Sequence, residues 1–207
     1  MINTEYTEKH KLSNKKLTSA GIELLQPDEI FVQYPLWNDY FGSNYGRLIS
    51  VKDGQIKLLK PSDQNGYLGY KLAKVAYGKQ RTISVSAHRL VADIFLPNYW
   101  KHLDRNQLQA HHLDHNKLNN DYRNLVLLPT NLHQIMNRVK KMVLLQNRQI
   151  IPVTPYEASE ATGLTLDEII LGTKKKPLKS PNKYSVYDVG GHLIGIQWLS
   201  KKSKRKK

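Results

Sequence analysis

Short segments in which apolar and polar residues alternate dominate the chain over residues 29–85. Residues 67–75 and 81–85 are two such segments, and the turn-forming dipeptide Gly78-Lys79 separates them. Alternation puts successive side chains on opposite faces of a strand, and glycine-containing dipeptides are typical of the tight turns between strands. The pattern therefore predicts a small antiparallel sheet.

Helical spacing replaces this alternation after Ser86, and the helical segment ends near Pro97. Its apolar residues are Leu90, Val91, Ile94 and Phe95. Farther along, residues 124–129 have the pattern of a short strand, and we expect a second helix that Thr130 caps. The apolar residues of that helix are Leu132, Ile135, Met136 and Val139. A histidine-rich strand and loop, a strand and a helix thus follow one another.

A third segment has the pattern of two short helices joined by a turn. Thr154 and Pro155 supply an N-cap and a first-turn proline, Gly163 ends the helix, and residues 164–171 begin another. Two short helices around a glycine turn are typical of a helix-turn-helix. The overall expectation is an α+β fold: a small antiparallel sheet, then a strand–strand–helix unit, then a small helix-turn-helix module.

The composition is strongly basic, with 32 Lys and Arg against 17 Asp and Glu and a formal net charge of +15. Such an excess favours contact with a polyanion, with nucleic acid before an anionic membrane surface. Cysteine is absent, which excludes disulfides, a thiol nucleophile and cysteine-ligated metal centres. No apolar run approaches the roughly 18–20 residues that span a bilayer, and no signal pattern opens the chain, so we expect a soluble cytoplasmic protein without membrane contact.

Four of the eight histidines lie between His111 and His133. Hydrolysis of a phosphodiester needs a base that deprotonates water near neutral pH, and an imidazole with a pKa of about 6.5 can do so. It also needs a cation to offset the negative charge of the transition state. Adjacent histidines on a strand, such as His111 and His112, point to opposite sides, so one can hold a metal while the other faces the water. Asn124 lies 12 residues and His133 21 residues beyond His112, and Asn137 follows His133 by one helical turn.

With these residues, the chain resembles the HNH nuclease family over residues 110–125 and 128–137. The resemblance implies a ββα-metal finger in which His112 is the general base and His111 and His133 are metal ligands. It further implies that Asn124 pins the loop and orients the base, and that Asn137 is the third protein ligand. We expect one divalent metal ion, Mg²⁺ or Mn²⁺, with Zn²⁺ or Ni²⁺ as alternatives because the site is neutral and rich in nitrogen.

Neighbouring stretches are similar to the modules that accompany HNH units in homing endonucleases of phages and introns. Residues 37–50, 69–72 and 87–98 look like the nuclease-associated modular domain, and residues 157–164 are similar to a DNA-binding helix-turn-helix repeat. The expected domains are a flexible arm over residues 1–28, a DNA-binding sheet over 29–85, a catalytic domain over 86–145, a helix-turn-helix module over 146–190 and a basic tail over 191–207. We expect the apolar stripes of the sheet and the catalytic domain to be complete before residue 141.

Basic and polar residues on the DNA-binding elements are candidates for contact with phosphates or bases. On the sheet these are Arg47, Lys57, Lys71 and Lys74. Arg89 could clamp a phosphate, and Thr165, at the start of the second short helix, could face a groove. The basic run after that helix consists of Lys174, Lys175 and Lys176. For the charged residues, an ordinary solvated face is the alternative interpretation.

The first hypothesis is a metal-dependent HNH homing endonuclease that recognises and hydrolyses double-stranded DNA without an obligate protein partner. The resemblance implies attack of water at phosphorus, and products with 5′-phosphate and 3′-hydroxyl ends. A non-cleaving phage DNA-binding regulator is one alternative, although a purely structural finger has no need for His112. An HNH restriction endonuclease is the other.

Overall fold

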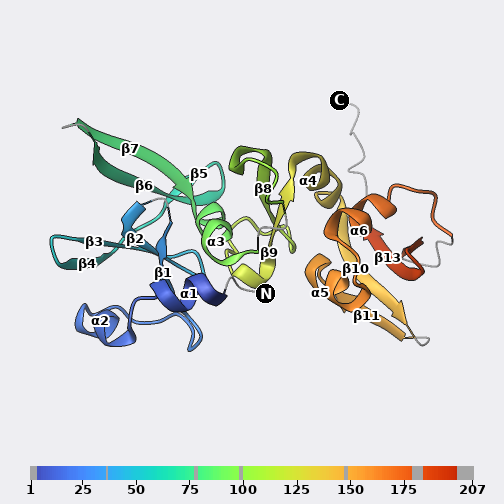
Figure 1. The fold of residues 1–207 in the computed structure, drawn as a ribbon, viewed down its shortest axis with the longest axis horizontal. Coiled ribbons are helices and arrows are strands. Elements are labelled where there is room, and N and C mark those ends of the chain that lie inside the picture. Colours follow the sequence, from blue (N-terminus) through green and yellow to red (C-terminus); the bar gives the residue numbers. More distant parts are fainter. Residues whose placement is uncertain are drawn as a thin grey trace, which may run out of the picture. The chain divides into compact units, whose positions relative to one another are not determined.

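The computed structural model describes residues 4–35, 37–76, 79–97, 100–146, 149–178 and 184–199. It is a mixed α/β structure of small sheets and short helices (Figure 1). Contacts concentrate in two compact units, Met1–Leu127 and Leu128–Lys207, called unit 1 and unit 2 below. Within the described residues, each helix is too short or too polar to span a membrane.

The first sheet of unit 1 is antiparallel, and its four strands lie side by side in chain order. They are β1 (Phe31–Tyr34), β2 (Trp37–Ser43), β3 (Leu48–Lys52) and β4 (Gln55–Leu58). The alternating pattern predicted one small antiparallel sheet over residues 29–85. The structure has antiparallel strands there but divides them between two sheets, and the segments 67–75 and 81–85 belong to the second.

Two helices, α1 (Thr4–His10) and α2 (Asn14–Ser19), occupy the stretch for which we expected a flexible arm. One apolar cluster joins this stretch to the first sheet. It consists of Leu12, Leu17, Ile22, Phe31 and Ile49. Burial removes these side chains from water, which stabilises an ordered segment in spite of its polar composition.

The second sheet of unit 1 contains a long hairpin. Its strands, in order, are β5 (Ser62–Gln64), β6 (Tyr67–Ala76) and β7 (Lys79–Ser86). Helix α3 (Ala87–Phe95) follows directly, with Ser86 at its N-cap, and it contacts strands of both sheets (Figure 1). Gly42 on β2 permits this close packing, because a Cβ atom there would lie 2.6 Å from Ile94 Cδ1.

The strand–strand–helix order predicted around the histidines is present. Strand β8 (Leu108–His112) pairs with β9 (Leu125–Pro129), and helix α4 (Thr130–Met136) follows. The short 3₁₀ turns η1 (Arg105–Gln107) and η2 (Tyr122–Asn124) precede the two strands. The division between the two units falls within β9.

Helix α4 differs from the predicted helix at both ends. Pro129 rather than Thr130 is the N-cap, and the helix ends at Met136. Val139 was expected on the helix, but it begins strand β10 (Val139–Gln146) and pairs with Trp198. This pairing joins residues far apart in the sequence and buries Val139, so no local pattern could indicate it.

Unit 2 is built on an antiparallel sheet in the order β11-β10-β13-β12. Its other strands are β11 (Gln149–Val153), β12 (Ser185–Val189) and β13 (His192–Trp198). Strand β10 has partners on both sides, so part of the expected catalytic domain, residues 86–145, pairs with strands that lie farther along the chain. Strand β13 occupies the start of the expected basic tail, where the alternate residues Ile194 and Ile196 are buried. The cationic end of that tail lies outside the described residues.

The two short helices predicted in unit 2 are present as α5 (Pro155–Thr162) and α6 (Leu166–Gly172). Thr154 and Thr165 cap them, each in reciprocal hydrogen bonds with the glutamate three residues later. Gly163 follows α5 with a φ of 70°, a left-handed conformation that glycine adopts readily. The buried apolar residues of α6 are Leu166, Ile169 and Ile170.

Candidate active site

His111 and His112 end strand β8, and both are buried, with 4% and 6% of their surface exposed. Their rings have different neighbours, as expected for adjacent residues of a strand. The centroid of the His111 ring lies 5.3 Å from that of His115, and the centroid of the His112 ring lies 5.2 Å from that of His88. The tandem pair therefore has two separate environments within unit 1.

The side chain of Asn120 holds one nitrogen of His112. His112 Nε2 lies 3.2 Å from Asn120 Oδ1, and Asn120 Nδ2 donates to the carbonyl of Leu118 at 3.2 Å. The second bond fixes the amide so that its oxygen faces the imidazole. Since an amide oxygen can only accept, His112 Nε2 carries the proton and Nδ1 is the basic nitrogen.

Asn124 holds the loop between β8 and η2. Its Oδ1 accepts from the backbone N–H of Asp114 at 3.1 Å, and its Nδ2 donates to Asp114 Oδ1 and to the carbonyl of Asn119, both at 2.9 Å. The resemblance implies that Asn124 holds the loop and orients the base, and these hydrogen bonds are of the kind that hold a loop. The imidazole of His112 donates to Asn120 instead, a residue that sequence reasoning missed because its only signal is its place in an asparagine-rich loop.

The carboxylate of Asp114 accepts three hydrogen bonds within the same loop. It accepts from the backbone N–H of Asn116 and from the side-chain amide of Asn119, both at 2.8 Å, and from Asn124 at 2.9 Å. Burial raises the pKa of Asp114, but these hydrogen bonds outweigh it, so the pKa lies below its usual value. Asp114 is therefore ionised at neutral pH, and its oxygens stabilise the shape of the loop.

Burial also determines the protonation state of the imidazoles. It lowers the pKa of His112, with Lys117 acting in the same direction and Asn120 and Asp114 acting against it. Burial lowers the pKa of His133 as well. Both rings are therefore neutral near pH 7 and offer a nitrogen lone pair to a proton or a metal.

The predicted metal ligands lie in different units. His111 belongs to unit 1, while His133 on α4 and Asn137 at the C-cap of α4 belong to unit 2. His133 Nδ1 lies 3.3 Å from Asn137 Nδ2. Among the described residues, no group of three or more His, Asp or Glu side chains is arranged to hold a metal. The donors themselves are mainly imidazole nitrogens, which suit a transition metal better than Mg²⁺.

Two arginines predicted to contact DNA are engaged inside unit 1. Arg47 Nε donates to Glu29 Oε1 at 2.9 Å, and Glu29 is only 1% exposed. Arg89 Nε donates to Asp93 Oδ1 at 2.9 Å, and its two other nitrogens donate to backbone carbonyls. Removing the cation from the buried carboxylate of Glu29 would be strongly destabilising. The carboxylate of Asp93 is largely buried and is shared by Arg89 and Arg105, so the guanidinium groups of Arg47 and Arg89 both serve the fold.

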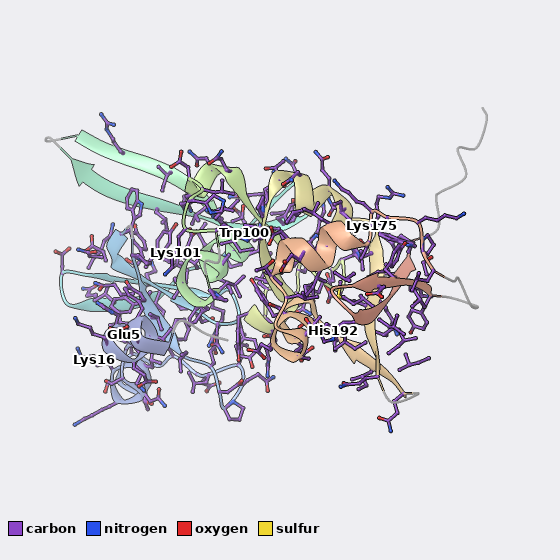
Figure 2. The ribbon with its side chains drawn as sticks, turned by 45° about the vertical axis from the view of Figure 1, so that its right-hand side comes forward. Glu5, Lys16, Trp100, Lys101, Lys175 and His192 are labelled. Atoms are coloured by element: carbon purple, nitrogen blue, oxygen red, sulfur yellow. The ribbon has the colours of Figure 1, made fainter. Side chains whose placement is uncertain are left out.

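Exposed lysines are the remaining basic candidates. Lys57 lies on β4, and Lys71 lies on β6 beside a surface cavity of about 710 Å³ that Lys60 also lines. Lys74 is on the same strand as Lys71, and its side chain lies outside the described part of the chain. The run Lys174, Lys175 and Lys176 is exposed after α6, and Figure 2 labels Lys175.

Thr165, the predicted groove-facing residue, caps a helix. Its Oγ1 accepts from the backbone N–H of Glu168 at 3.4 Å and donates to Glu168 Oε2 at 2.6 Å. Helices α5 and α6 contain no basic residue and four acidic ones, which are Glu157, Glu160, Asp167 and Glu168. Negative charge disfavours contact with a phosphate backbone, so the lysines beyond α6 are better candidates than the helix pair itself.

Comparison with known proteins gives two curated relatives, while no protein-family model matches the sequence. The H-N-H endonuclease F-TflII of Escherichia phage T5 is 32% identical over 115 residues. The uncharacterized HNH endonuclease L245 of Acanthamoeba polyphaga mimivirus is 31% identical over 158 residues. The matches cover 55% and 71% of this chain but 54% and 44% of the relatives, so the chain spans about half the length of these relatives. Both similarities support assignment of the chain to the HNH endonuclease family.

A solved structure described as DNA binding and cleavage by the HNH homing endonuclease I-HmuI is also similar. The alignment covers 83% of this chain and 98% of that chain, with a TM-score of 0.37 and 20% identity. A similarity this low assigns no role to any residue of the candidate site.

Proposed function

We propose that this chain is a metal-dependent HNH endonuclease that hydrolyses phosphodiester bonds of double-stranded DNA, in the role of a homing endonuclease. The observation that carries the proposal is the state of His112. The imidazole is buried and neutral, its Nε2–H is held by Asn120, and its Nδ1 is left as the basic nitrogen. A neutral imidazole held in one tautomer is the arrangement that general-base catalysis requires.

In the proposed mechanism, His112 Nδ1 accepts a proton from the water that attacks phosphorus. The imidazole then carries a positive charge, which the oxygen of Asn120 and the carboxylate of Asp114 stabilise. Asn124 maintains the loop that carries these groups. A bound divalent ion would supply positive charge against the phosphorane-like transition state and the leaving 3′ oxygen.

The resemblance, rather than the geometry, assigns the metal to His111, His133 and Asn137. The chemistry of the donors fits that assignment, because His111 is a buried imidazole and burial lowers the pKa of His133. A neutral nitrogen lone pair binds Mn²⁺, Ni²⁺ or Zn²⁺ more readily than it binds Mg²⁺. We therefore propose a transition metal ion as the working cofactor.

For DNA binding we propose the exposed lysines rather than Arg47 and Arg89, whose guanidinium groups are paired with Glu29 and Asp93. Lys57, Lys71 and the run Lys174–Lys176 are exposed, and the lysines in the cavity beside β6 can reach a phosphate without breaking an ion pair among the described residues. Contacts of this kind supply affinity that is independent of sequence and falls with salt. Recognition of a particular site, and with it the homing role, rests on the family resemblance.

A supercoiled-plasmid assay tests the proposed function. We expect wild-type protein to convert the plasmid to nicked or linear forms with Mn²⁺ or Ni²⁺, and to leave it intact with EDTA. A protein that binds the plasmid but cuts it with none of Mg²⁺, Mn²⁺ and Ni²⁺ would contradict the proposal. It would instead favour a non-cleaving DNA-binding regulator.

A further inference from the structure

Lys117 lies in the loop that also carries Asn120, and its amine is held in one place although the residue is exposed. Its Nζ lies 4.2 Å from the centroid of the Tyr67 ring and 3.5 Å from the carbonyl oxygen of Asn65. The aliphatic part of the Lys117 side chain lies beside Gly66, where an added Cβ atom would be 3.8 Å from Lys117 Cδ. A long, flexible side chain is thus positioned by a turn and an aromatic ring.

The same aromatic ring touches the candidate active site. The centroid of the Tyr67 ring lies 4.9 Å from that of His88 and 6.0 Å from that of His112. All of these residues belong to unit 1, so the arrangement does not depend on the position of unit 2. Tyr67 therefore connects a fixed amine with the proposed general base.

The charge of this amine is not neutralised within the described part of the chain. The ion pairs found there do not include Lys117, and the carboxylate of Asp114 in the same loop accepts from three other donors. An aromatic face and a carbonyl attract a cation without cancelling its charge. An ammonium held in this way can still bind an anionic group.

We propose that Lys117 is a further catalytic residue, whose amine contacts the phosphate that is cleaved. This inference rests on the proposed nuclease function. The partner would be a non-bridging oxygen of the scissile phosphodiester, whose negative charge grows as water adds to phosphorus. A fixed cation stabilises such a transition state more than the ground state, which raises the rate rather than the affinity. In this respect Lys117 differs from Lys57 and Lys71, which would contact phosphates outside the reaction.

Single-turnover cleavage of supercoiled plasmid, with the protein saturating and Mn²⁺ present, tests this role. Lys117→Met keeps the length of the side chain and removes the charge. We expect its rate to fall about 10²–10³-fold, while its affinity for the plasmid changes by less than about threefold. Lys117→Arg, which restores a cation, should recover at least about a tenth of the wild-type rate. Lys101→Met is the matched control, because Lys101, labelled in Figure 2, is an exposed lysine in another turn of unit 1, and it should leave both quantities unchanged.

Two results would overturn the proposal. If Lys117→Met cuts at the wild-type rate under saturation, the amine does not touch the reacting phosphate, even if binding becomes weaker. If Lys117→Arg is as slow as Lys117→Met while both variants melt like the wild type, charge is not what the position supplies. Failure of the wild-type protein itself to cut would instead overturn the proposed nuclease function, and the role of Lys117 with it.

Discussion

The loop around His112 and the helix pair of unit 2 are both rich in polar residues, but they use them differently. In the loop, Asn120 bonds the imidazole of His112, and Asn124 bonds Asp114. In the helix pair, Thr154 and Thr165 form hydrogen bonds within the first turns of their own helices. Polar side chains that form hydrogen bonds with one another across a loop can build a site, whereas the two threonines cap the N-terminal ends of their helices. The comparison indicates that the loop is arranged for chemistry and the helix pair for stability.

The largest effects should come from the proposed metal ligands. His111→Ala and His133→Ala each remove an imidazole, and we expect cleavage to fall by at least about 100-fold together with metal affinity. Asn137→Ala should have a smaller effect, since an amide oxygen is a weak ligand that water can replace. Calorimetric titration with Mn²⁺ measures the affinities, and His112→Ala serves as the control that retains them. Equal affinity for Mn²⁺ in all four variants would contradict the assignment of His111, His133 and Asn137 as metal ligands.

Within the loop, the two asparagines should differ in their effect on cleavage. Asn120→Ala leaves the buried His112 Nε2–H without its acceptor, and we expect cleavage by the folded protein to fall about 10–100-fold, together with a loss of about 1–3 kcal/mol in the free energy of unfolding. Asn124→Ala removes three hydrogen bonds, and we expect the free energy of unfolding to fall by about 1–3 kcal/mol. Cleavage under saturation and urea unfolding measure the two quantities. A slow Asn124→Ala beside a fully active Asn120→Ala would show that Asn124 orients the base, as the resemblance implies.

Local patterns predicted the parts of the fold that local residues determine. Alternation predicted strands β6 and β7, and the Thr154 and Gly163 signals predicted helix α5. Val139 was placed on a helix because its spacing fits one, while its pairing with Trp198 in β13 has no local signature. The polar N-terminal stretch likewise contains few apolar residues, and their burial depends on the distant Phe31 and Ile49.

In the candidate site, too, the sequence indicates local features but not contacts between distant residues. The spacing of His111, His112, Asn124 and His133 is a property of the sequence, so the resemblance could be found there. The engagement of Arg47 with Glu29, and of Arg89 with Asp93 and two carbonyls, depends on how the chain folds back on itself. A basic residue on a strand or helix therefore remains ambiguous until its partners are known. The pairing of His112 with Asn120 rather than Asn124 likewise depends on how the loop folds, which the sequence does not indicate.

The smallest effects should come from the helix pair. Thr165→Ala removes a cap, and we expect unit 2 to lose about 1 kcal/mol of stability with no change in DNA affinity. Replacing Lys174, Lys175 and Lys176 with glutamine should instead reduce the salt dependence of binding, by about 0.9 in the slope of log K for each phosphate that is no longer neutralised. Thermal melts and binding isotherms at several salt concentrations separate the two results. If Thr165→Ala weakened binding to DNA at constant stability, the helix pair would be a recognition element and the comparison above would fail.

Single-turnover cleavage of saturated plasmid by His112→Ala, beside the wild type, decides whether His112 is the general base. The variant loses the nitrogen that would accept the proton of the attacking water, and nothing that binds DNA. We therefore predict a rate about 10²–10⁴-fold lower, with unchanged affinity for the plasmid. Cleavage by the variant at more than about a tenth of the wild-type rate would show that His112 is not the general base.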